Sequence, residues 1–394
     1  MNSTAKLWVL AFCRFSIVLV TLLICTANIT NSALLTWGFH EDQNSANYQI
    51  TFYEMMNGTA RKPFVYRSSF PRGVKWAVSR LGPDLQEKLY TQVKKHDAIR
   101  RLYFNRLPDK YWTPIVAVTY YVTYFTVVAA MFLSLWLIYR LARAHALKFG
   151  QALGFVVAFS LIYPLTFQES AFYYDFLELL GLFAACSFLL RRQMLACTIC
   201  IALASFNKET FFLAPLALVF LHERDVSLRA RVGWLGLQLA CCLASRHLIT
   251  TGYDANIGSA VEFHLFDNVR FWINPKSYLI FWNVISKGVP TPSVQNPLII
   301  VPLIVYFLAA WRMAGTRYRH YLHAALWPLV ALFIPFGYFD EVRALSLAFP
   351  ALTLIALHGA NRFTDIFSSA TEPVKMAGDS PLVSATLPDA QRET

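Results

Sequence analysis

The chain has 394 residues, of which 56% are hydrophobic and only 15% are charged, and its formal net charge is +12. Its mean hydropathy of +0.43 excludes an ordinary soluble domain, because soluble chains of this length rarely carry so much apolar surface. The basic residues cluster beside apolar runs, which indicates orientation in a bilayer and contact with anionic membrane lipids. The sequence has no zinc knuckle, RNA-binding motif or base-reading basic helix, so we expect no nucleic-acid partner.

Apolar runs of helical length follow one another along the chain and predict an all-α, polytopic transmembrane bundle of about ten spans within residues 1–358. Two short runs, 194–206 and 211–221, form either a helical hairpin that dips partly through the membrane or one broken helix. Pro328 and Pro335 are expected to interrupt the ninth run. The predicted spans are 7–35, 115–139, 150–167, 176–190, 194–206, 211–221, 233–249, 297–311, 322–339 and 344–357.

Two long polar segments and a polar tail complete the predicted organisation. The first loop, 36–114, is expected outside the cytoplasm, and its last helical piece combines an apolar stripe with many Lys and Arg. That pattern is typical of a helix lying on a membrane surface, although a solvated linker is the alternative. Residues 250–296 form a second outer loop, and the Pro- and Ser-containing residues 359–394 predict a flexible cytoplasmic tail. Helical periodicity in the first loop covers 48–56, 74–81 and 85–104.

The short connections alternate in charge if both short runs are separate helices. On one side they carry eleven Lys or Arg, whereas the short connections on the other side carry only Lys208 and Arg343. Because short positive loops remain in the cytoplasm, this asymmetry predicts ten spans with both termini cytoplasmic. The eleven basic residues are Arg140, Arg143, Lys148, Arg191, Arg192, Arg224, Arg229, Arg231, Arg312, Arg317 and Arg319.

The same topology gathers ionisable residues on the extracytoplasmic side, at or near the ends of spans. Such groups are costly to desolvate, so they tend to face a cavity or a partner. Asp175 and Glu178 are three positions apart on one helical face, and Lys208 is expected to pair with an acid from another span. The residues expected on this side are Glu41, Asp42, Glu169, Asp175, Glu178, Lys208, Glu209, Asp254, Asp340, Glu341 and Arg343.

This set of residues can support transfer from a lipid-phosphate donor. Glu41 or Asp42 can act as a general base by taking the proton of an attacking hydroxyl, or the pair can hold a divalent cation through oxygen ligands. A Lys or Arg on the same face can neutralise a phosphate leaving group. The alternative is that these residues are ordinary interfacial charges that contact lipid headgroups.

Several short motifs resemble those of the GT-C superfamily of integral membrane glycosyltransferases. One is a single span followed by a long outer loop with an acidic pair, here Glu41-Asp42. The sequence departs from the family's motifs at two places. The family usually has Arg where this chain has Lys208, and His40-Glu41-Asp42 does not match a DxD motif, in which two Asp residues flank one other residue. The other motifs are Phe64-Val65-Tyr66-Arg67, Tyr174-Asp175-Phe176-Leu177-Glu178-Leu179-Leu180, Phe206-Asn207-Lys208-Glu209-Thr210 and Glu341-Val342-Arg343.

The resemblance implies transfer of a sugar from a polyprenyl-phosphate carrier to an acceptor on the outer face of the bacterial inner membrane. It implies Asp42 or Glu41 as the base, and a lipid-linked sugar donor and membrane lipids as partners. No organic cofactor is implied, and metal dependence stays open. The substrate-binding candidates are Lys208, Glu209, Arg343, Asp175 and Arg67.

Two other functions remain possible from the sequence. One is a transporter or lipid flippase, which a broken helix around 207–210 would suit, and the other is a non-catalytic GT-C-like scaffold.

Overall fold

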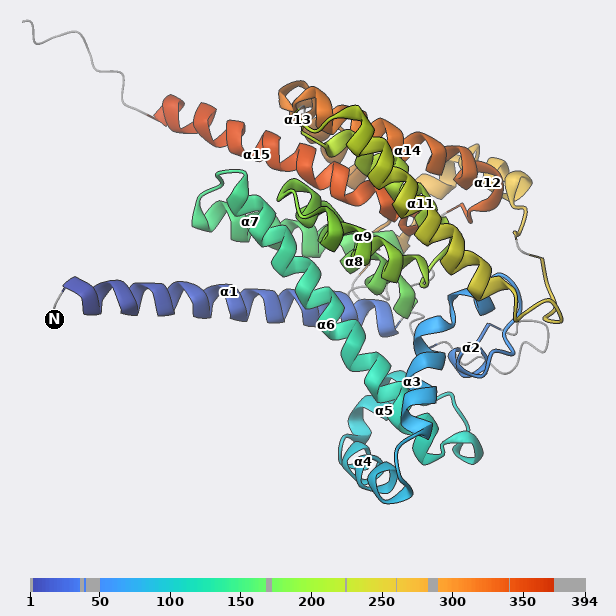
Figure 1. Cartoon of the computed structure of the whole chain (residues 1–394). Helices are drawn as coiled ribbons and strands as arrows, with labels where there is room; N and C mark the ends of the chain where they lie inside the picture. The colour runs from blue at the N-terminus through green and yellow to red at the C-terminus, as the bar shows by residue number, and fades with distance from the viewer. Residues whose placement is uncertain are drawn as a thin grey trace, which may run out of the picture.

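A computed structural model describes residues 3–35, 39, 50–167, 172–223, 225–259, 261–282, 290–339 and 341–371. Within this part of the chain the protein is a bundle of α-helices, which confirms the predicted all-α class (Figure 1). Among the described residues, β-structure is limited to a two-residue antiparallel pairing of Phe281–Trp282 (β1) with Thr291–Pro292 (β2).

The bundle is built from long helices and from short helical pieces that extend or join them. Short 3-10 segments follow α7 (η4, Tyr163–Phe167), flank α10 (η5, Glu209–Phe212; η6, Val219–Leu221) and precede α15 (η8, Val342–Ala348). The α-helices of the bundle are α1 (Ser3–Ala33), α6 (Pro114–Ala144), α7 (Phe149–Ile162), α8 (Tyr173–Leu190), α9 (Met194–Ser205), α10 (Leu213–Leu218), α11 (Leu228–Thr250), α13 (Pro297–Met313), α14 (Thr316–Phe336) and α15 (Phe349–Thr371).

Six helices are long and apolar enough to cross a membrane, which identifies the chain as an integral membrane protein. They coincide with six of the predicted spans. The other predicted spans also fold as helices, but α9, the segment Glu209–Leu221 and α13 are shorter than 18 residues, and α14 contains several charged or polar residues in its first turns. The six are Thr4–Ala33, Pro114–Ala144, Phe149–Phe167, Tyr173–Leu190, Leu228–Thr250 and Val342–Asn361.

Local sequence explains where several of these helices begin. Thr113 accepts a hydrogen bond from the Val116 backbone N–H at the start of α6, and Ser227 accepts one from the Ala230 N–H at the start of α11. Such caps satisfy backbone donors that have no partner inside the helix. α8 and α9 then pack closely, because a Cβ added to Gly181 would lie 2.6 Å from the Ala204 Cβ.

The two polar segments also contain helices. The first holds α2 (Phe52–Asn57), η2 (Phe64–Arg67), α3 (Ser69–Ser79), α4 (Pro83–Lys95), α5 (Asp97–Tyr103) and η3 (Asp109–Tyr111). The second holds α12 (Leu265–Trp272) and η7 (Pro275–Leu279). The two segments are joined, because the Asn256 side chain donates to the backbone oxygens of Gly58 (3.0 Å) and Ala60 (2.8 Å).

Three details differ from the sequence-based expectations. The piece predicted at 85–104 is divided at His96, which leaves helical geometry (φ −102°, ψ 37°). Its carbonyl accepts both the Ile99 backbone N–H at 3.0 Å and the Tyr121 hydroxyl at 2.8 Å. α14 continues through Pro328 and Pro335. α15 runs to Thr371, past the predicted start of a flexible tail at 359, because no proline occurs between Pro350 and Pro373.

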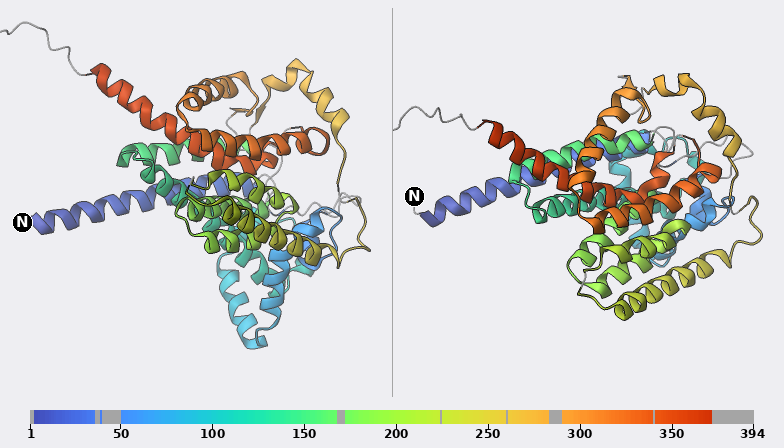
Figure 2. Two further views of the ribbon diagram at one scale, coloured as in Figure 1. Left: turned by 45° about the horizontal axis from the view of Figure 1, so that its top comes forward. Right: turned by 90° about the horizontal axis from the view of Figure 1, so that it is seen from above.

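The connections between helices gather at two ends of the bundle (Figures 1 and 2). At the end we call the basic end, Arg192 of the α8–α9 turn pairs with Asp225 of the α10–α11 turn at 3.0 Å. There too, the ring of His145 in the α6–α7 turn lies 5.0 Å from that of His358 in α15. The opposite end, which we call the loop end, carries the two polar segments. The start of α1 and the last turns of α15 both point away from the loop end.

Candidate functional site

A buried cluster of charged side chains lies at the loop end, where α8 begins and α9 ends. Lys208 donates to Glu178 at 2.8 Å and lies 3.8 Å from Asp175. Arg343 donates to the other oxygen of Asp175 at 2.5 Å. The side chains of Glu178, Asp175, Arg343 and Lys208 retain only 1%, 3%, 7% and 8% of their exposure. Two carboxylates and two cations therefore neutralise each other inside the bundle.

The start of α8 depends on this cluster. The Asp175 oxygen that contacts Arg343 also accepts the backbone N–H of Phe172 at 2.9 Å. A carboxylate in the first turn satisfies a free backbone donor and interacts favourably with the positive end of the helix. Arg343 in turn lies over the Phe172 ring, with its guanidinium carbon 4.9 Å from the ring centroid, and donates to Glu341 at 2.8 Å. One arginine thus ties η8 to the first turn of α8.

A second ion pair lies beside this cluster and is more accessible. Arg67 at the end of η2 makes a bidentate contact with Glu209, with N–O distances of 2.5 and 3.2 Å. A third donor of Arg67 reaches the Tyr174 hydroxyl at 3.1 Å. The Arg67 and Glu209 side chains keep 17% and 24% of their exposure, so this pair borders the outside. We call Arg67, Glu209 and Tyr174 the rim.

The cluster and the rim are built from the same two pieces of chain. Asp175 follows Tyr174, and Glu209 follows Lys208, so each dipeptide contributes one residue to each group. The Asn207 side chain donates to the Tyr174 backbone oxygen at 2.6 Å, which holds the two dipeptides together. The rim therefore cannot move far without disturbing the buried cluster.

The charge state of the rim follows from its geometry. Burial disfavours the charged form of Arg67, but the nearby Glu209 carboxylate outweighs that penalty, and the pKa of Arg67 lies well above its ordinary value. Arg67 therefore stays protonated at every physiological pH. A protonated guanidinium at a partly open position, with its carboxylate partner displaced, can bind a phosphate bidentately.

Three buried acceptor oxygens in or beside the cluster have no hydrogen-bond partner among the described residues. They are one oxygen of Asp175, which has only Lys208 at 3.8 Å, one oxygen of Glu178, and the side-chain oxygen of Asn207. Unsatisfied buried acceptors are uncommon and call for an explanation such as a ligand or an ordered water. A molecule carrying hydroxyl groups supplies the donors that these oxygens lack.

The structure places the predicted site residues in three groups. Asp175, Lys208 and Arg343 meet in one cluster, and Lys208 does pair with an acid from another helix, as expected. Arg67 and Glu209 meet in the rim. Glu41 and Asp42 lie outside the described residues, as does His40 before them.

A series of aromatic contacts connects the described residues on either side of the acidic pair to the start of α8. Phe39 is buried, and its ring lies 4.9 Å from that of Phe52. The Phe52 ring lies 5.4 Å from the ring of Tyr173, the residue before Tyr174. The Tyr173 hydroxyl donates to the Arg67 backbone oxygen at 2.5 Å. Phe39 and Phe52, which flank the acidic pair in the sequence, therefore belong to the same packing unit as the rim.

The sequence predicts Glu341 on the outer face but gives it no role in the site, and it does not single out Tyr174 or Asn207 as site residues. All three are sequence neighbours of predicted residues, but tyrosine and asparagine at span ends carry no distinctive signal. The three-residue spacing between Asp175 and Glu178 is the sequence signal for the place of Glu178 in the cluster. Within the described ranges, no three His, Cys, Asp or Glu side chains form a group that could hold a metal ion, and this leaves the predicted role of Glu41 and Asp42 as cation ligands untested.

Comparison of the chain with known protein families, with curated proteins and with solved structures finds no match. The site must therefore be interpreted from its own chemistry.

Proposed function

We propose that the protein is a GT-C-like membrane glycosyltransferase that moves a sugar from a polyprenyl-phosphate-linked donor to an acceptor at the extracytoplasmic face. The observation that carries the proposal is the meeting of charged residues from four distant chain segments at the loop end. These segments contain Arg67, Asp175, Lys208 with Glu209, and Arg343. They are the segments that carry the GT-C-like motifs.

We further propose ten passes through the membrane, with both termini in the cytoplasm of a bacterial cell and the loop end outside. The two short passes support this topology. α9 starts beside Arg192 at the basic end and leads to Lys208 in the cluster, and the chain then returns to Glu223, which also pairs with Arg192. Each short helix therefore joins opposite ends of the bundle. The excess of Lys and Arg at the basic end agrees with a cytoplasmic location.

The first polar segment supports a membrane-surface role for its helices. α4 and α5 contain no buried residues, and they project to one side of the bundle at the loop end (Figures 1 and 2). Exposed apolar side chains on this segment include Trp76, Leu85 and Leu102. Apolar residues beside many Lys and Arg suit a helix that lies at the headgroup level.

In the proposed reaction an acceptor hydroxyl attacks the anomeric carbon of the donor sugar. The bond between that carbon and the phosphate oxygen breaks, polyprenyl phosphate leaves, and Asp42 or Glu41 takes the hydroxyl proton. Arg67 is the best placed cation for the departing phosphate, because it is accessible at the rim. Lys208 and Arg343 are buried against carboxylates and hold the frame that positions Arg67.

The test is a transfer assay on the purified, full-length protein with polyprenyl-phosphate-linked sugars as donors. We expect release of free polyprenyl phosphate together with a glycosylated acceptor from added membrane extract. Loss of a general base typically costs about 10² to 10⁴ in rate, so Asp42→Ala or Glu41→Ala should lower turnover by that factor. The matched control is Asp84→Ala, which removes an exposed carboxylate from α4 in the same segment.

Normal transfer by both Asp42→Ala and Glu41→Ala would show that neither carboxylate is the base. Absence of transfer with every donor, combined with proton- or ion-dependent uptake in liposomes, would favour the second candidate, a transporter or lipid flippase. One observation supports that candidate: the helix break between α9 and η5 carries the buried Lys208, and interrupted helices with charges at the break are typical of transporters. Absence of both activities would leave a non-catalytic scaffold.

A further inference from the structure

A second site lies at the basic end of the bundle, far from the cluster and the rim in the chain's topology. It is a cavity of about 240 Å³ between α1, α6 and the start of α7. That volume is below the roughly 300 to 1,000 Å³ of pockets that enclose drug-sized ligands. The cavity therefore suits a small charged group rather than a whole large ligand. Its lining residues are Arg14, Phe15, Val18, Trp136, Tyr139, Arg143 and Phe149.

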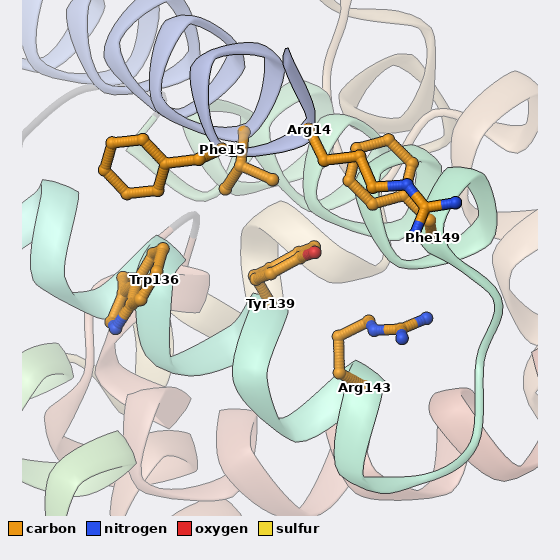
Figure 3. A pocket seen from close by; sticks show the side chains of 7 residues that line it. Arg14, Phe15, Trp136, Tyr139, Arg143 and Phe149 are labelled. Atoms are coloured by element: carbon orange, nitrogen blue, oxygen red, sulfur yellow. The ribbon is translucent and has the colours of Figure 1, made fainter. Parts of the chain in front are cut away.

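Two arginines from different helices face this cavity. Figure 3 shows the side chains of Arg14 and Arg143 extending to the same side, with the Tyr139 side chain between them. Arg143 donates to the Leu147 backbone oxygen at 2.7 Å, and this bond uses only one of the five guanidinium N–H donors. The Arg14 guanidinium lies over the Phe149 ring, 5.8 Å from its centroid. This ring holds the arginine in place through a cation–π contact.

The cavity offers the arginines no counter-ion. None of its lining residues is acidic, and within the part of the chain that the structure describes neither arginine forms an ion pair with a carboxylate at 4.0 Å or less. Arg14 also lies within the apolar run of α1, in the segment counted as a membrane span. A cation at such a position is costly unless an anion or water solvates it.

The remaining walls of the cavity are apolar and aromatic. Phe15 and Val18 come from α1, and Trp136 comes from α6; in Figure 3 the Phe15 and Trp136 side chains lie on the opposite side from the two guanidinium groups. Aromatic side chains of this kind are enriched where headgroups meet acyl chains. A ligand that fits has an anionic head for the arginines and a hydrocarbon part for the aromatic side.

We propose that this cavity binds the phosphate of an anionic phospholipid from the leaflet at the basic end. Arg14 and Arg143 contact the phosphate, Tyr139 donates to it, and Phe15 and Trp136 contact the start of an acyl chain. Basic pockets between transmembrane helices are a known way to bind anionic headgroups, and guanidinium groups match phosphate geometry. The bound lipid would join α1 to α6 and α7. This inference is independent of the proposed sugar transfer.

The experiment measures lipid binding to the detergent-purified, full-length protein by native mass spectrometry. The probes are phosphatidylglycerol and, as the zwitterionic comparison, phosphatidylcholine with the same acyl chains. A hydrogen bond to a charged group contributes about 1.5 to 3 kcal/mol, so losing one arginine should weaken phosphatidylglycerol binding about tenfold or more. We therefore expect Arg14→Gln and Arg143→Gln to lose the tightest phosphatidylglycerol adduct, whereas the wild-type protein retains it.

The matched control is Arg140→Gln combined with Arg191→Gln, which removes two exposed charges from the same end but outside the cavity. Equal losses in the control and the cavity variants would overturn the proposal, as would equal binding of phosphatidylcholine. Full competition by inorganic phosphate would assign the cavity to a free anion rather than a lipid. The variant that combines Arg14→Gln with Arg143→Gln is compared with this double control, and if it does not fold, each single cavity variant is compared with Arg140→Gln alone.

Discussion

The two ends of the bundle use their positive charges in different ways. At the loop end, Arg67, Lys208 and Arg343 are each paired with a carboxylate, and the latter two are almost fully buried. At the basic end, Arg14, Arg140, Arg143, Arg191 and Arg229 are exposed, and the cavity at this end contains no acid. The helices that reach the two ends are similarly apolar. The two ends therefore differ in what solvates their positive charges.

This difference follows from the cost of removing a charge from water. A buried cation must have a carboxylate of its own, because the desolvation penalty of an isolated ion inside a protein is several kcal/mol. An exposed cation at a membrane surface can instead use water and lipid phosphates. The loop end therefore has a fixed internal arrangement of charge. At the basic end Arg192 pairs with Glu223 and Asp225, whereas the exposed arginines named above depend on what surrounds them.

The largest expected loss of stability comes from a substitution in the buried cluster. Lys208→Met leaves Glu178 buried without its cation, and removal of one partner from a buried pair costs about 3 to 5 kcal/mol. Thermal or denaturant unfolding in detergent should show this loss. The double variant Lys208→Met/Glu178→Gln removes both charges and should recover much of the lost stability. If the single variant unfolds like the wild type, the pair does not stabilise the loop end.

A smaller effect on stability is expected at the rim. Arg67→Gln breaks a pair that is partly open to the outside, and such pairs contribute about 1 kcal/mol or less. Under the proposed function the same change should lower sugar transfer about tenfold or more, because it removes a charge-assisted contact to the leaving phosphate. Glu209→Gln is the matched control, since it breaks the pair but keeps the cation. Equal losses of turnover in both variants would contradict a specific role for Arg67.

The smallest effect is expected for exposed charges at the basic end. Arg140→Gln should change the free energy of unfolding by about 0.5 kcal/mol or less, because surface substitutions away from packed features rarely do more. The measurement is the same unfolding experiment used for Lys208→Met. A loss of several kcal/mol here would mean that this arginine has a buried partner, and the contrast between the two ends would fail.

The fold class could be predicted from the sequence because long apolar runs leave few alternatives. The spans that begin at 115, 150 and 176 appear at nearly the predicted positions, since their boundaries coincide with caps and charges. The division of 85–104 at His96 could not be foreseen, because it depends on a tertiary hydrogen bond from Tyr121. The prediction of a flexible tail from residue 359 is wrong for 359–371, because it depends on polar composition alone and nothing in 360–371 breaks a helix.

Several charged members of the site could be predicted from the sequence, but the choice of partner for each charge could not. Asp175, Lys208 and Arg343 stood out as charges at the ends of apolar runs, and the charge asymmetry of the connections assigned them to one side. The sequence could not indicate that Lys208 contacts Glu178 while its neighbour Glu209 contacts Arg67. That division depends on the extended backbone of Lys208 (φ −155°, ψ 133°), which turns adjacent side chains to opposite sides.

The proposal that the loop end faces away from the cytoplasm is tested most directly by labelling with a membrane-impermeant thiol reagent. Asp84→Cys on α4 and Arg229→Cys at the start of α11 are exposed at opposite ends, and exposed Cys13 would be replaced by Ser in both. In intact cells whose outer membrane has been permeabilised, we expect Asp84→Cys to be labelled and Arg229→Cys to react only after the inner membrane is opened. Labelling of Arg229→Cys but not Asp84→Cys in intact cells would contradict the proposed orientation.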